Sequence, residues 1–269
     1  MPELPDIAVY IDRLAARIVG HRLEAVRLLN PFLLRTALPP IASTLGRTVQ
    51  GVERVGKRVV IALDGDLFVV IHLMIAGRLL WLAKGRTTAR NALAFFEFDT
   101  GTLALTEAGS KRRASLHVVD GRAALGALDA GGIDVLAASR DEFAARLVSE
   151  NHTLKRALTD PRLFSGIGNA YSDEILHRAR LSPVSLTRSL GAEAGDGFPE
   201  EVTALRKDMA VHGKYKQPCP VCGSPVQRIV YAENECNYCA RCQTGGKLLA
   251  DRSLSRLLKD DWPKSIDDL

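Results

Sequence analysis

The sequence lacks any run of about 18 consecutive apolar residues, so no segment is a candidate for a transmembrane helix. The N-terminus also lacks the basic and then apolar pattern of a secretory signal, and we therefore expect a cytoplasmic protein. No internal repeat and no low-complexity segment occurs. Cysteine is confined to residues 219–242, and in a reducing compartment its five thiols would not form disulfides. These absences predict an ordinary globular protein rather than a membrane, repeat or disulfide-bonded one.

The length of the chain limits the number of domains, and its charge indicates the kind of partner. The 269 residues allow one large domain or roughly two to three small ones. The chain is 46% hydrophobic and 25% charged, as is usual for a globular protein. A net charge of +5 and a pI near 9.0 fit a polyanionic partner. Because many basic proteins bind no nucleic acid, the charge alone favours such a partner only weakly.

The first part of the chain is predicted to combine one helix with many strands. Apolar residues at helical spacing predict a helix over residues 6–19, which Gly20 ends. Short apolar segments follow up to about residue 119, which is typical of a sandwich or barrel. Two β-hairpins are predicted around turns rich in Asp and Gly, over residues 59–63 and 67–71 and over residues 93–98 and 103–106.

Helical spacing returns after residue 120. It predicts helices over residues 141–148, 153–158, 169–179 and 253–259. Residues 192–197 are small and glycine-rich, as expected for a linker. The chain is thus predicted to contain four parts: a sandwich domain at 1–120, a helical domain at 121–215, a cysteine segment at 216–246 and a tail at 247–269.

The chain begins with Met1-Pro2-Glu3, and a small second residue usually allows the initiator methionine to be removed. The chain would then start with the secondary amine of proline. An α-amine titrates near pH 7.7–8.0, so a fraction of it is neutral and nucleophilic, and it can form a Schiff base with a carbonyl-like carbon. Glu3 could move the protons. The alternative is that Pro5 and Asp6 only start a helix, with Asp6 as its cap.

Four cysteines form two C-x2-C pairs, Cys219 with Cys222 and Cys239 with Cys242. Thiolate pairs at this spacing bind one tetrahedral Zn²⁺ at Zn–S distances of about 2.3 Å, and a site closed by four sulfurs is structural. The intervening residues suit a zinc ribbon with a strand at residues 229–231. Cys236 and Cys239 also form a C-x2-C pair; we favour Cys239 and Cys242, with Cys236 outside the site.

Lys155 and Asn169 lie on either side of a break between two predicted helices, which contains Gly166-Ile167-Gly168. Glycine turns and a helix N-terminus expose backbone N–H groups that bind phosphate well. Asn169 would begin the second helix and would reach a ligand or, as the alternative, only cap the helix.

Three other polar segments have a functional and a structural interpretation. Lys57 opens a predicted strand and is either a site residue or a solvated edge lysine. Lys111-Arg112-Arg113 lies in a predicted loop and is either a phosphate clamp or a solvated turn. His72 is interpreted as a core or turn histidine.

Together these segments resemble the formamidopyrimidine-DNA glycosylase/endonuclease VIII family over most of the chain. Met1-Pro2-Glu3-Leu4-Pro5 looks like the N-terminal signature of that family, residues 166–174 look like its helix-two-turns-helix motif, and the cysteine pairs, ending in Cys242-Gln243, look like its zinc hairpin. The resemblance implies an α+β multidomain fold: an N-terminal β-sandwich with an N-terminal helix, a helix-two-turns-helix domain and a C-terminal zinc ribbon.

The resemblance also implies a base-excision-repair enzyme. It would remove oxidised bases from double-stranded DNA and nick abasic sites by β- and δ-elimination, as a monomer associated with the nucleoid and with one structural zinc. Pro2 would be the nucleophile on C1′, Glu3 the acid/base and Lys57 a catalytic-site lysine. The implied DNA-binding residues are Lys155, Asn169, Lys111, Arg112, Arg113 and Tyr171.

Several positions depart from the family pattern. Asp6 stands where the family usually has Glu, and Ile75 and the segment 111–114 stand where many members insert Met, Arg and Phe into the DNA stack. The hairpin tip reads Glu233-Asn234-Glu235 where an Arg is usual, and a long helix after residue 180 is missing. These departures favour one alternative, a non-catalytic zinc-dependent DNA-binding paralogue. A general zinc-ribbon nucleic-acid module would explain only the C-terminus.

Overall fold

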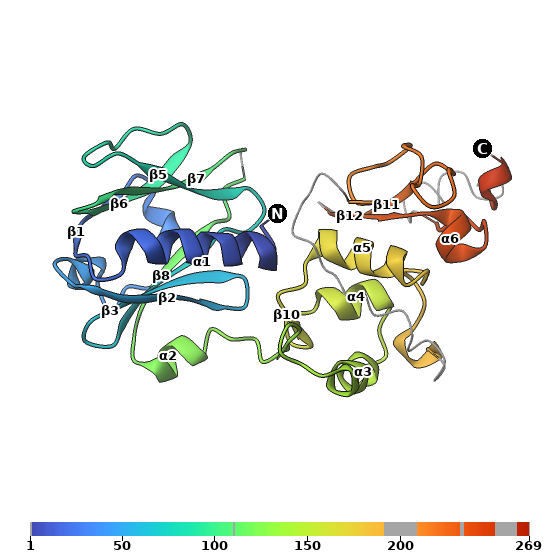
Figure 1. Cartoon of the computed structure of the whole chain (residues 1–269), viewed down its shortest axis with the longest axis horizontal. Helices are drawn as coiled ribbons and strands as arrows, with labels where there is room; N and C mark the ends of the chain where they lie inside the picture. Colours follow the sequence, from blue (N-terminus) through green and yellow to red (C-terminus); the bar gives the residue numbers. More distant parts are fainter. Residues whose placement is uncertain (1, 110, 191–208, 232–233, 251–262, 269) are drawn as a thin grey trace. The chain divides into compact units, whose positions relative to one another are not determined.

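The structure is a computed structural model that describes residues 2–109, 111–190, 209–231, 234–250 and 263–268 (Figure 1). The chain forms two compact units, Met1–Ala130 and Gly131–Leu269. The predicted linker at 192–197 and the predicted tail helix at 253–259 lie outside the described residues. The predicted domain boundaries within the second unit stay predictions.

The first unit is an α+β structure dominated by strands. Its helices are α1 (Leu4–Ile18) and α2 (Arg122–Gly126), with 3-10 turns η1 (Pro31–Leu33) and η2 (Ile41–Thr44). Its strands are β1 (Leu23–Leu28), β2 (Val49–Val55), β3 (Arg58–Leu63), β4 (Leu67–His72), β5 (Gly77–Leu82), β6 (Ala92–Phe98), β7 (Gly101–Glu107) and β8 (Ser115–Asp120).

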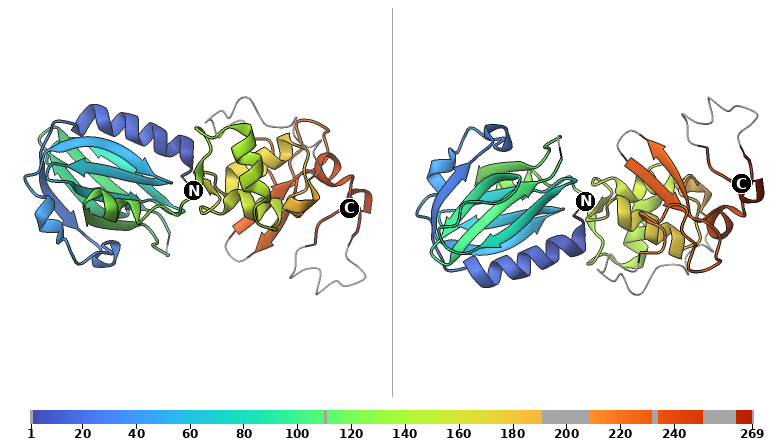
Figure 2. Two further views of the ribbon diagram at one scale, coloured as in Figure 1. Left: turned by 90° about the horizontal axis from the view of Figure 1, so that it is seen from below. Right: turned by 90° about the horizontal axis from the view of Figure 1, so that it is seen from above.

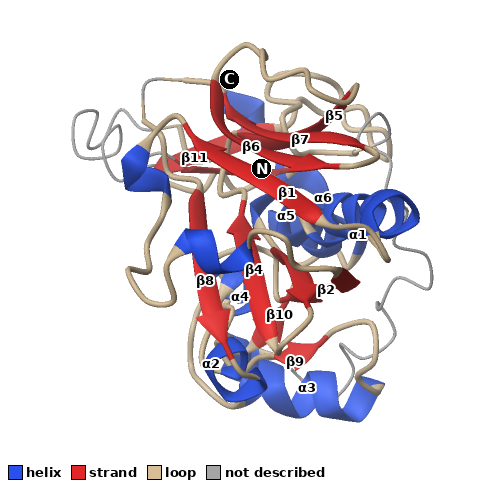
Figure 3. Ribbon diagram, turned by 90° about the vertical axis from the view of Figure 1, so that its left-hand side faces the viewer, coloured by secondary structure: helices blue, strands red, loops and turns tan. Residues whose placement is uncertain are grey.

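These strands form two four-stranded antiparallel sheets, drawn in red in Figure 3. One sheet has the order β1-β6-β7-β5 and the other β2-β3-β4-β8. The predicted sandwich is therefore confirmed. Both predicted hairpins are also confirmed, as β3–β4 and β6–β7. Gly65 and Asp66 adopt φ angles of 73° and 58° in the β3–β4 turn, a conformation that Gly and Asp tolerate better than other residues.

The core explains why residues 59–63 are apolar without alternation. On one face of β3, Val59, Ile61 and Leu63 join a cluster with residues of both sheets and of α1. On the other face, Val60 and Ala62 pack in a second cluster with Leu125 of α2. A strand that is covered on both faces must be apolar at every position, as in a continuous hydrophobic run.

Helix α1 begins two residues earlier than predicted, and the expectation that Asp6 is its N-cap is wrong. The N-cap is Glu3, and Asp6 occupies the third helical position. The Asp6 carboxylate accepts a hydrogen bond from the Glu3 N–H at 2.9 Å. Pro5 is tolerated because first-turn N–H groups have no partner within the helix. In a capping box, the side chain at the third helical position accepts a hydrogen bond from the N–H of the N-cap residue. Asp6 makes this bond here, where a Glu is more usual.

The second unit begins with a helical part, which we define as residues 131–190. Its elements are α3 (Arg140–Val148), α4 (Leu154–Thr159), α5 (Asn169–Arg178), the 3-10 turn η3 (Thr187–Ser189) and the short parallel strands β9 (Ile133–Asp134) and β10 (Phe164–Ser165). The three predicted helices are therefore confirmed, with ends shifted by one residue (Figure 2). Their apolar faces meet in one cluster that includes Leu154, Leu158, Phe164 and Leu176.

The cysteine part, defined as residues 209–250, follows in the same unit. It contains β11 (Gln227–Tyr231), β12 (Asn234–Tyr238) and α6 (Ala240–Thr244), and η7 (Ile266–Asp268) lies near the C-terminus. β11 and β12 form an antiparallel hairpin, so the predicted strand at residues 229–231 is confirmed. No helix among the described residues is long and apolar enough to cross a membrane.

The sandwich core gives a test of stability. Phe96 is fully buried between the sheets, whereas Phe32 is 78% exposed. We expect Phe96→Ala to lower the free energy of unfolding by about 3–5 kcal/mol, because it removes buried area and leaves a cavity. Phe32→Ala should change it by less than about 0.5 kcal/mol. Chemical denaturation measures both values, and equal effects of the two substitutions would contradict this core.

Candidate active site and cysteine centre

The start of α1 places Pro2 and Glu3 in a buried position. Both residues are buried, and Glu3 is only 1% exposed. Glu3 is the N-cap, where the positive end of the helix dipole stabilises a carboxylate. The fold therefore holds a carboxylate directly beside residue 2. An amine at residue 2 that exchanges protons during a reaction would need such a group.

Lys57 lies in the two-residue turn between β2 and β3, so β3 starts at Arg58 and not at Lys57 as predicted. Gly56 adopts a φ of 58° in this turn, which suits a tight hairpin. The Lys57 side chain is half-buried, so the alternative of a solvated edge lysine is wrong. Burial lowers the pKa of Lys57, and the negative charge of Glu3 opposes this shift. Lys57 and Glu3 are thus close enough to interact electrostatically.

A histidine at the end of β4, His72, lies within electrostatic range of Lys57 and Arg58. His72 pairs in register with Arg58 of β3 and with Ser115 of β8. Burial, with the charges of Arg58, Lys57 and His117, lowers the pKa of His72 to about 4. The imidazole is therefore neutral near pH 7. Burial is the main reason why His72 is neutral, and the nearby charges of Arg58 and Lys57 act in the same direction; these two cations favour an anion nearby.

The basic run Lys111-Arg112-Arg113 lies in the loop between β7 and β8, as predicted. Its backbone is held by Glu107, which is 1% exposed. The Glu107 carboxylate accepts hydrogen bonds from the N–H of Arg113 at 2.9 Å and from the N–H of Ala114 at 3.0 Å. The three basic side chains are exposed. The loop therefore presents its positive charges to solvent from a fixed backbone.

Lys155 of α4 is 6% exposed. Its Nζ donates to the Asn169 carbonyl at 2.5 Å and to Oδ1 of Asp173 at 2.5 Å. Gly168, not Asn169, is the N-cap of α5, so the alternative in which Asn169 only caps the helix is wrong. The Asn169 Nδ2 donates instead to the Glu235 carbonyl of β12 at 2.8 Å.

Tyr171 lies in the first turn of α5. Its half-buried side chain packs against the apolar cluster of the helical part. The structure therefore brings Lys155 and Asn169 together, whereas Tyr171 contributes to the packing that holds α5 in place.

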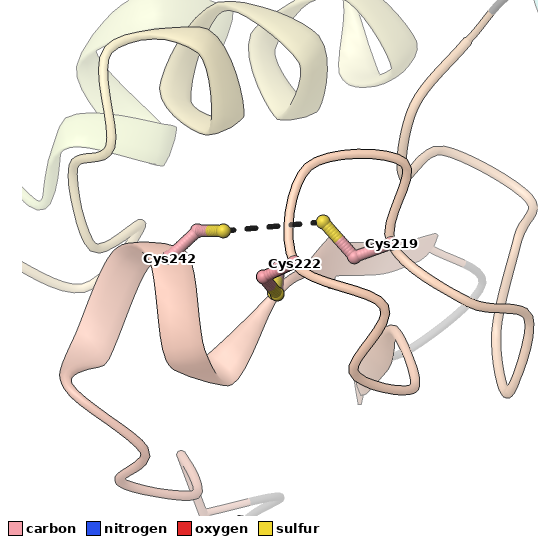
Figure 4. A group of neighbouring side chains, drawn as sticks. Cys219, Cys222 and Cys242 are labelled. Atoms are coloured by element: carbon pink, nitrogen blue, oxygen red, sulfur yellow. Dashed lines mark hydrogen bonds between the residues drawn. The ribbon is translucent and has the colours of Figure 1, made fainter.

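Four of the five cysteines form one cluster. The Sγ atoms of Cys219, Cys222, Cys239 and Cys242 all lie within 4.8 Å of one another. Figure 4 shows the Cys219 and Cys242 sulfurs facing each other at 3.9 Å, and the Cys222–Cys239 pair is 3.4 Å apart. Tetrahedral coordination with metal–sulfur bonds of about 2.3 Å requires sulfur separations of about 3.8 Å. The cluster therefore fits a four-sulfur metal site.

Local structure explains how the two pairs meet. The Cys219 N–H donates to the Ser224 carbonyl, and Gly223 takes a φ of 76° in the same turn. Cys239 is the N-cap of α6 and Cys242 lies within that helix. Burial opposes ionisation of the Cys222 thiol, but hydrogen bonds with Ser224 and the neighbouring thiols lower its pKa to about 6. A thiolate is the form that binds a metal.

Cys236 lies outside this cluster, on β12, and is 3% exposed. Burial and the negative charge of Asp173 both raise the pKa of Cys236. The position of its sulfur outside the cluster separates Cys236 from the other four cysteines. The structure thus agrees with the choice of Cys239 and Cys242 as the second pair.

Sequence reasoning missed the two carboxylates that hold these segments, Glu107 and Asp173. Asp173 is 1% exposed and binds Lys155, the Nδ1 of His212 at 2.7 Å and the Asn237 N–H at 3.2 Å. Its hydrogen-bond partners lie 18 to 64 residues away in the chain, so no local pattern reveals them. The sequence feature that could have pointed to Asp173 is its position one helical turn after Asn169.

The sequence matches two family models. Residues 1–124 match the formamidopyrimidine-DNA glycosylase N-terminal domain, and residues 134–214 match the formamidopyrimidine-DNA glycosylase H2TH domain. The formamidopyrimidine-DNA glycosylase of Heliobacterium modesticaldum is 31% identical over 278 residues, with 90% of this chain and 100% of that protein covered. An uncharacterised formamidopyrimidine-DNA glycosylase-like protein of Mycobacterium tuberculosis is 39% identical over 148 residues, with 48% of this chain and 94% of that protein covered.

Solved structures show the same fold. The complex between the Lactococcus lactis Fpg and an abasic-site-containing DNA superposes with a TM-score of 0.80 at 20% identity, with 90% of this chain and 100% of that chain covered. The same enzyme with an N7-benzyl-Fapy-dG-containing DNA gives a TM-score of 0.79 at 21% identity, with the same coverage.

The cysteine geometry gives a test by metal analysis. We expect about one metal ion per chain, held by four thiolates. Cys236→Ser should retain it because Cys236 lies outside the cluster, whereas Cys242→Ser should lose it because one ligand is gone. Elemental analysis of the purified variants measures both. Loss of the metal from Cys236→Ser together with retention by Cys242→Ser would show that the ligand set is different.

Proposed function

Because this chain belongs to the formamidopyrimidine-DNA glycosylase family, we propose that it is a DNA glycosylase that excises oxidised bases and nicks the resulting abasic site. The observation that carries the proposal is the buried Pro2-Glu3 pair at the positive end of α1, with Lys57 within electrostatic range of Glu3. The relatives with this name and the DNA in the similar solved structures support a damaged DNA duplex as the substrate.

Removal of Met1 would turn the Pro2 nitrogen into a secondary amine. The helix dipole disfavours a positive charge at this end of α1 and so favours the neutral, nucleophilic amine. Attack on C1′ forms an N–C bond while the glycosidic bond breaks; the N–H proton of Pro2 passes to the Glu3 carboxylate, which then gives it to the leaving base. The nitrogen lone pair then opens the sugar ring to form an iminium, and the ring oxygen takes up a proton.

Strand cleavage follows from the same intermediate. The iminium acidifies the C2′ proton, and its transfer to a carboxylate expels the 3′ phosphate in β-elimination. A second proton loss from the conjugated sugar expels the 5′ phosphate in δ-elimination. Glu3 is the carboxylate that the fold places beside the reacting nitrogen, and burial excludes bulk water from it. Lys57 would balance the Glu3 charge as protons move.

Attack on C1′ inside a duplex requires the nucleotide to be turned out of the stack, which needs many backbone contacts. In the first unit we assign these contacts to Lys57 and the loop residues Lys111, Arg112 and Arg113. In the second unit we assign them to Lys155 and Asn169, with Tyr171 supporting α5.

The metal is proposed to be a single zinc ion. Four sulfur donors in tetrahedral array favour Zn²⁺ and leave no position for a substrate, so the ion would be structural. Cys219, Cys222, Cys239 and Cys242 would hold it and thereby join the end of the β11–β12 hairpin to α6.

The alternative is a non-catalytic DNA-binding paralogue, which the acidic hairpin tip favours. Within the described part of that tip, the Glu235 carboxylate accepts hydrogen bonds from Arg228 at 3.4 Å and from the Asn237 Nδ2 at 3.1 Å. The negative charge of Glu235 is therefore partly balanced inside the hairpin. It would repel DNA phosphates less than an unpaired carboxylate would. The segment after residue 180, where the sequence lacks the long helix, is described up to residue 190 and contains η3 there; residues 191–208 lie outside the described residues.

Covalent trapping distinguishes these functions. Incubation with abasic-site DNA and borohydride should reduce the iminium to a stable adduct that mass spectrometry maps to Pro2. The matched control is the same chain with an N-terminal tag that leaves Pro2 within a peptide bond, which should give no adduct. An adduct of equal yield in the tagged chain would rule out Pro2 as the nucleophile.

The loop at residues 111–113 gives a test of DNA affinity. The affinity should fall with salt at a log–log slope of about −0.9 per neutralised phosphate. Arg112→Ala should flatten this slope by roughly one unit, because it removes one exposed phosphate contact. Arg86→Ala removes an exposed Arg from a different loop and should leave the slope unchanged. Fluorescence anisotropy measures the slopes, and equal slopes for all three proteins would contradict the assignment of Arg112.

A further inference from the structure

The contacts between the helical part and the cysteine part concentrate on one polar stripe of α5. Asn169, Asp173, Glu174 and His177 recur at the spacing of a single helix face. Each of these four side chains binds the cysteine part. Asn169 donates to the Glu235 carbonyl, and Asp173 binds the His212 ring and accepts from the Asn237 N–H. Glu174 accepts from the N–H groups of Ala210, Val211 and His212 at 2.7, 2.9 and 2.8 Å, and His177 contacts the Cys219 sulfur at 3.3 Å.

The apolar packing does not duplicate this stripe. Among the described residues, the buried apolar side chains of the helical part form one cluster, and those of the cysteine part form two others. No buried cluster contains residues from both parts. The attachment of the metal-binding hairpin to α5 therefore depends on directed polar contacts, which are lost sharply when a single partner is removed.

Asp173 differs from the other residues of the stripe because its side chain binds a third element, which Asn169 contacts only through its backbone carbonyl. Its Oδ1 accepts from the Lys155 ammonium of α4, and its Oδ2 accepts from His212 and from the Asn237 N–H of β12. Both Lys155 and Asp173 are buried. A buried cation that loses its carboxylate must turn toward solvent or lose its proton.

We propose that Asp173 is a positioning residue that fixes Lys155 and the β11–β12 hairpin on the same helix, so that the Lys155 ammonium and the hairpin keep one arrangement relative to α5. This inference rests on the proposed function for the role of Lys155 in DNA contact. The attachment of the hairpin by Asp173 does not depend on that function.

Cys236 provides a reporter of the attachment. It is 3% exposed, lies next to Asp173 and is outside the metal cluster, whose ligand thiols are protected while the metal is bound. In Asp173→Asn, which retains the size but not the charge, we expect alkylation of Cys236 to be at least about tenfold faster, with about one zinc per chain retained. Because the Asp173 charge is itself one cause of the raised pKa of Cys236, faster labelling counts as detachment only if His212→Phe, which keeps that charge, also labels faster than the wild type. Asp160→Asn removes a carboxylate from the Asp160–Arg162 ion pair of the helical part, in which the Asp160 side chain is 11% exposed, and should leave Cys236 protected.

The link to Lys155 is tested by a double-mutant cycle on affinity for abasic-site DNA. Lys155→Met and Asp173→Asn should each weaken binding, and the double variant should be weakened by less than the product of the two factors, because the Lys155–Asp173 contact is lost in both. A merely structural role for Asp173 would give additive effects. Additive effects, or slow Cys236 labelling in zinc-loaded Asp173→Asn, would overturn the inference, as would loss of zinc from that variant.

Failure of the proposed function and failure of the inference about Asp173 give different results. If the wild-type chain does not bind abasic-site DNA, the proposed function fails, and the labelling result still decides whether Asp173 attaches the hairpin. If Asp173→Asn does not fold, His212→Phe removes only a donor to Oδ2 and should label Cys236 at least about threefold faster than wild type. Unchanged labelling in His212→Phe would then overturn the inference.

Discussion

The burial of three carboxylates is the constraint on which the functional segments depend. Glu3, Glu107 and Asp173 are each 1% exposed, and they are the only acidic residues in the buried class within the described ranges. An ionised carboxylate is costly to bury unless charges or hydrogen bonds satisfy it. Each carboxylate therefore holds the groups that bind it. Glu3 holds the start of α1, and Glu107 holds the end of the loop that carries Lys111 to Arg113. Asp173 holds Lys155 against α5 and binds β12.

These three carboxylates leave different amounts of positive charge available to a polyanion. Glu107 is satisfied by backbone N–H groups of Arg113 and Ala114, and the basic residues of its loop are exposed. Asp173 is satisfied by the Lys155 ammonium itself, so that pair has little net charge. We infer that the loop contributes long-range attraction and salt dependence, whereas Lys155 contributes a directed N–H at short range.

Local patterns in the sequence were sufficient for most of the fold. The periodicity of residues 141–148 and 169–179, the Asp64-Gly65-Asp66 turn and the two C-x2-C pairs each depend on residues within a few positions of one another, and each was predicted correctly. The start of α1 was predicted two residues too late, and the alternatives in which Asp6 and Asn169 are N-caps are wrong: both are favourable caps by type, but Glu3 and Gly168 hold these positions. Glu107 and Asp173 escaped prediction because a buried acid is recognisable only once the fold has brought its partners to it.

The central claim is that this chain excises a base and breaks the strand, rather than only binding DNA. The most direct measurement is the identity of the strand ends produced from a duplex that contains one formamidopyrimidine lesion. The account predicts a one-nucleotide gap with a phosphate on both sides without alkali treatment, as required by excision followed by β- and δ-elimination. A strand that stays intact even after alkali, while the same protein binds the duplex, would contradict it.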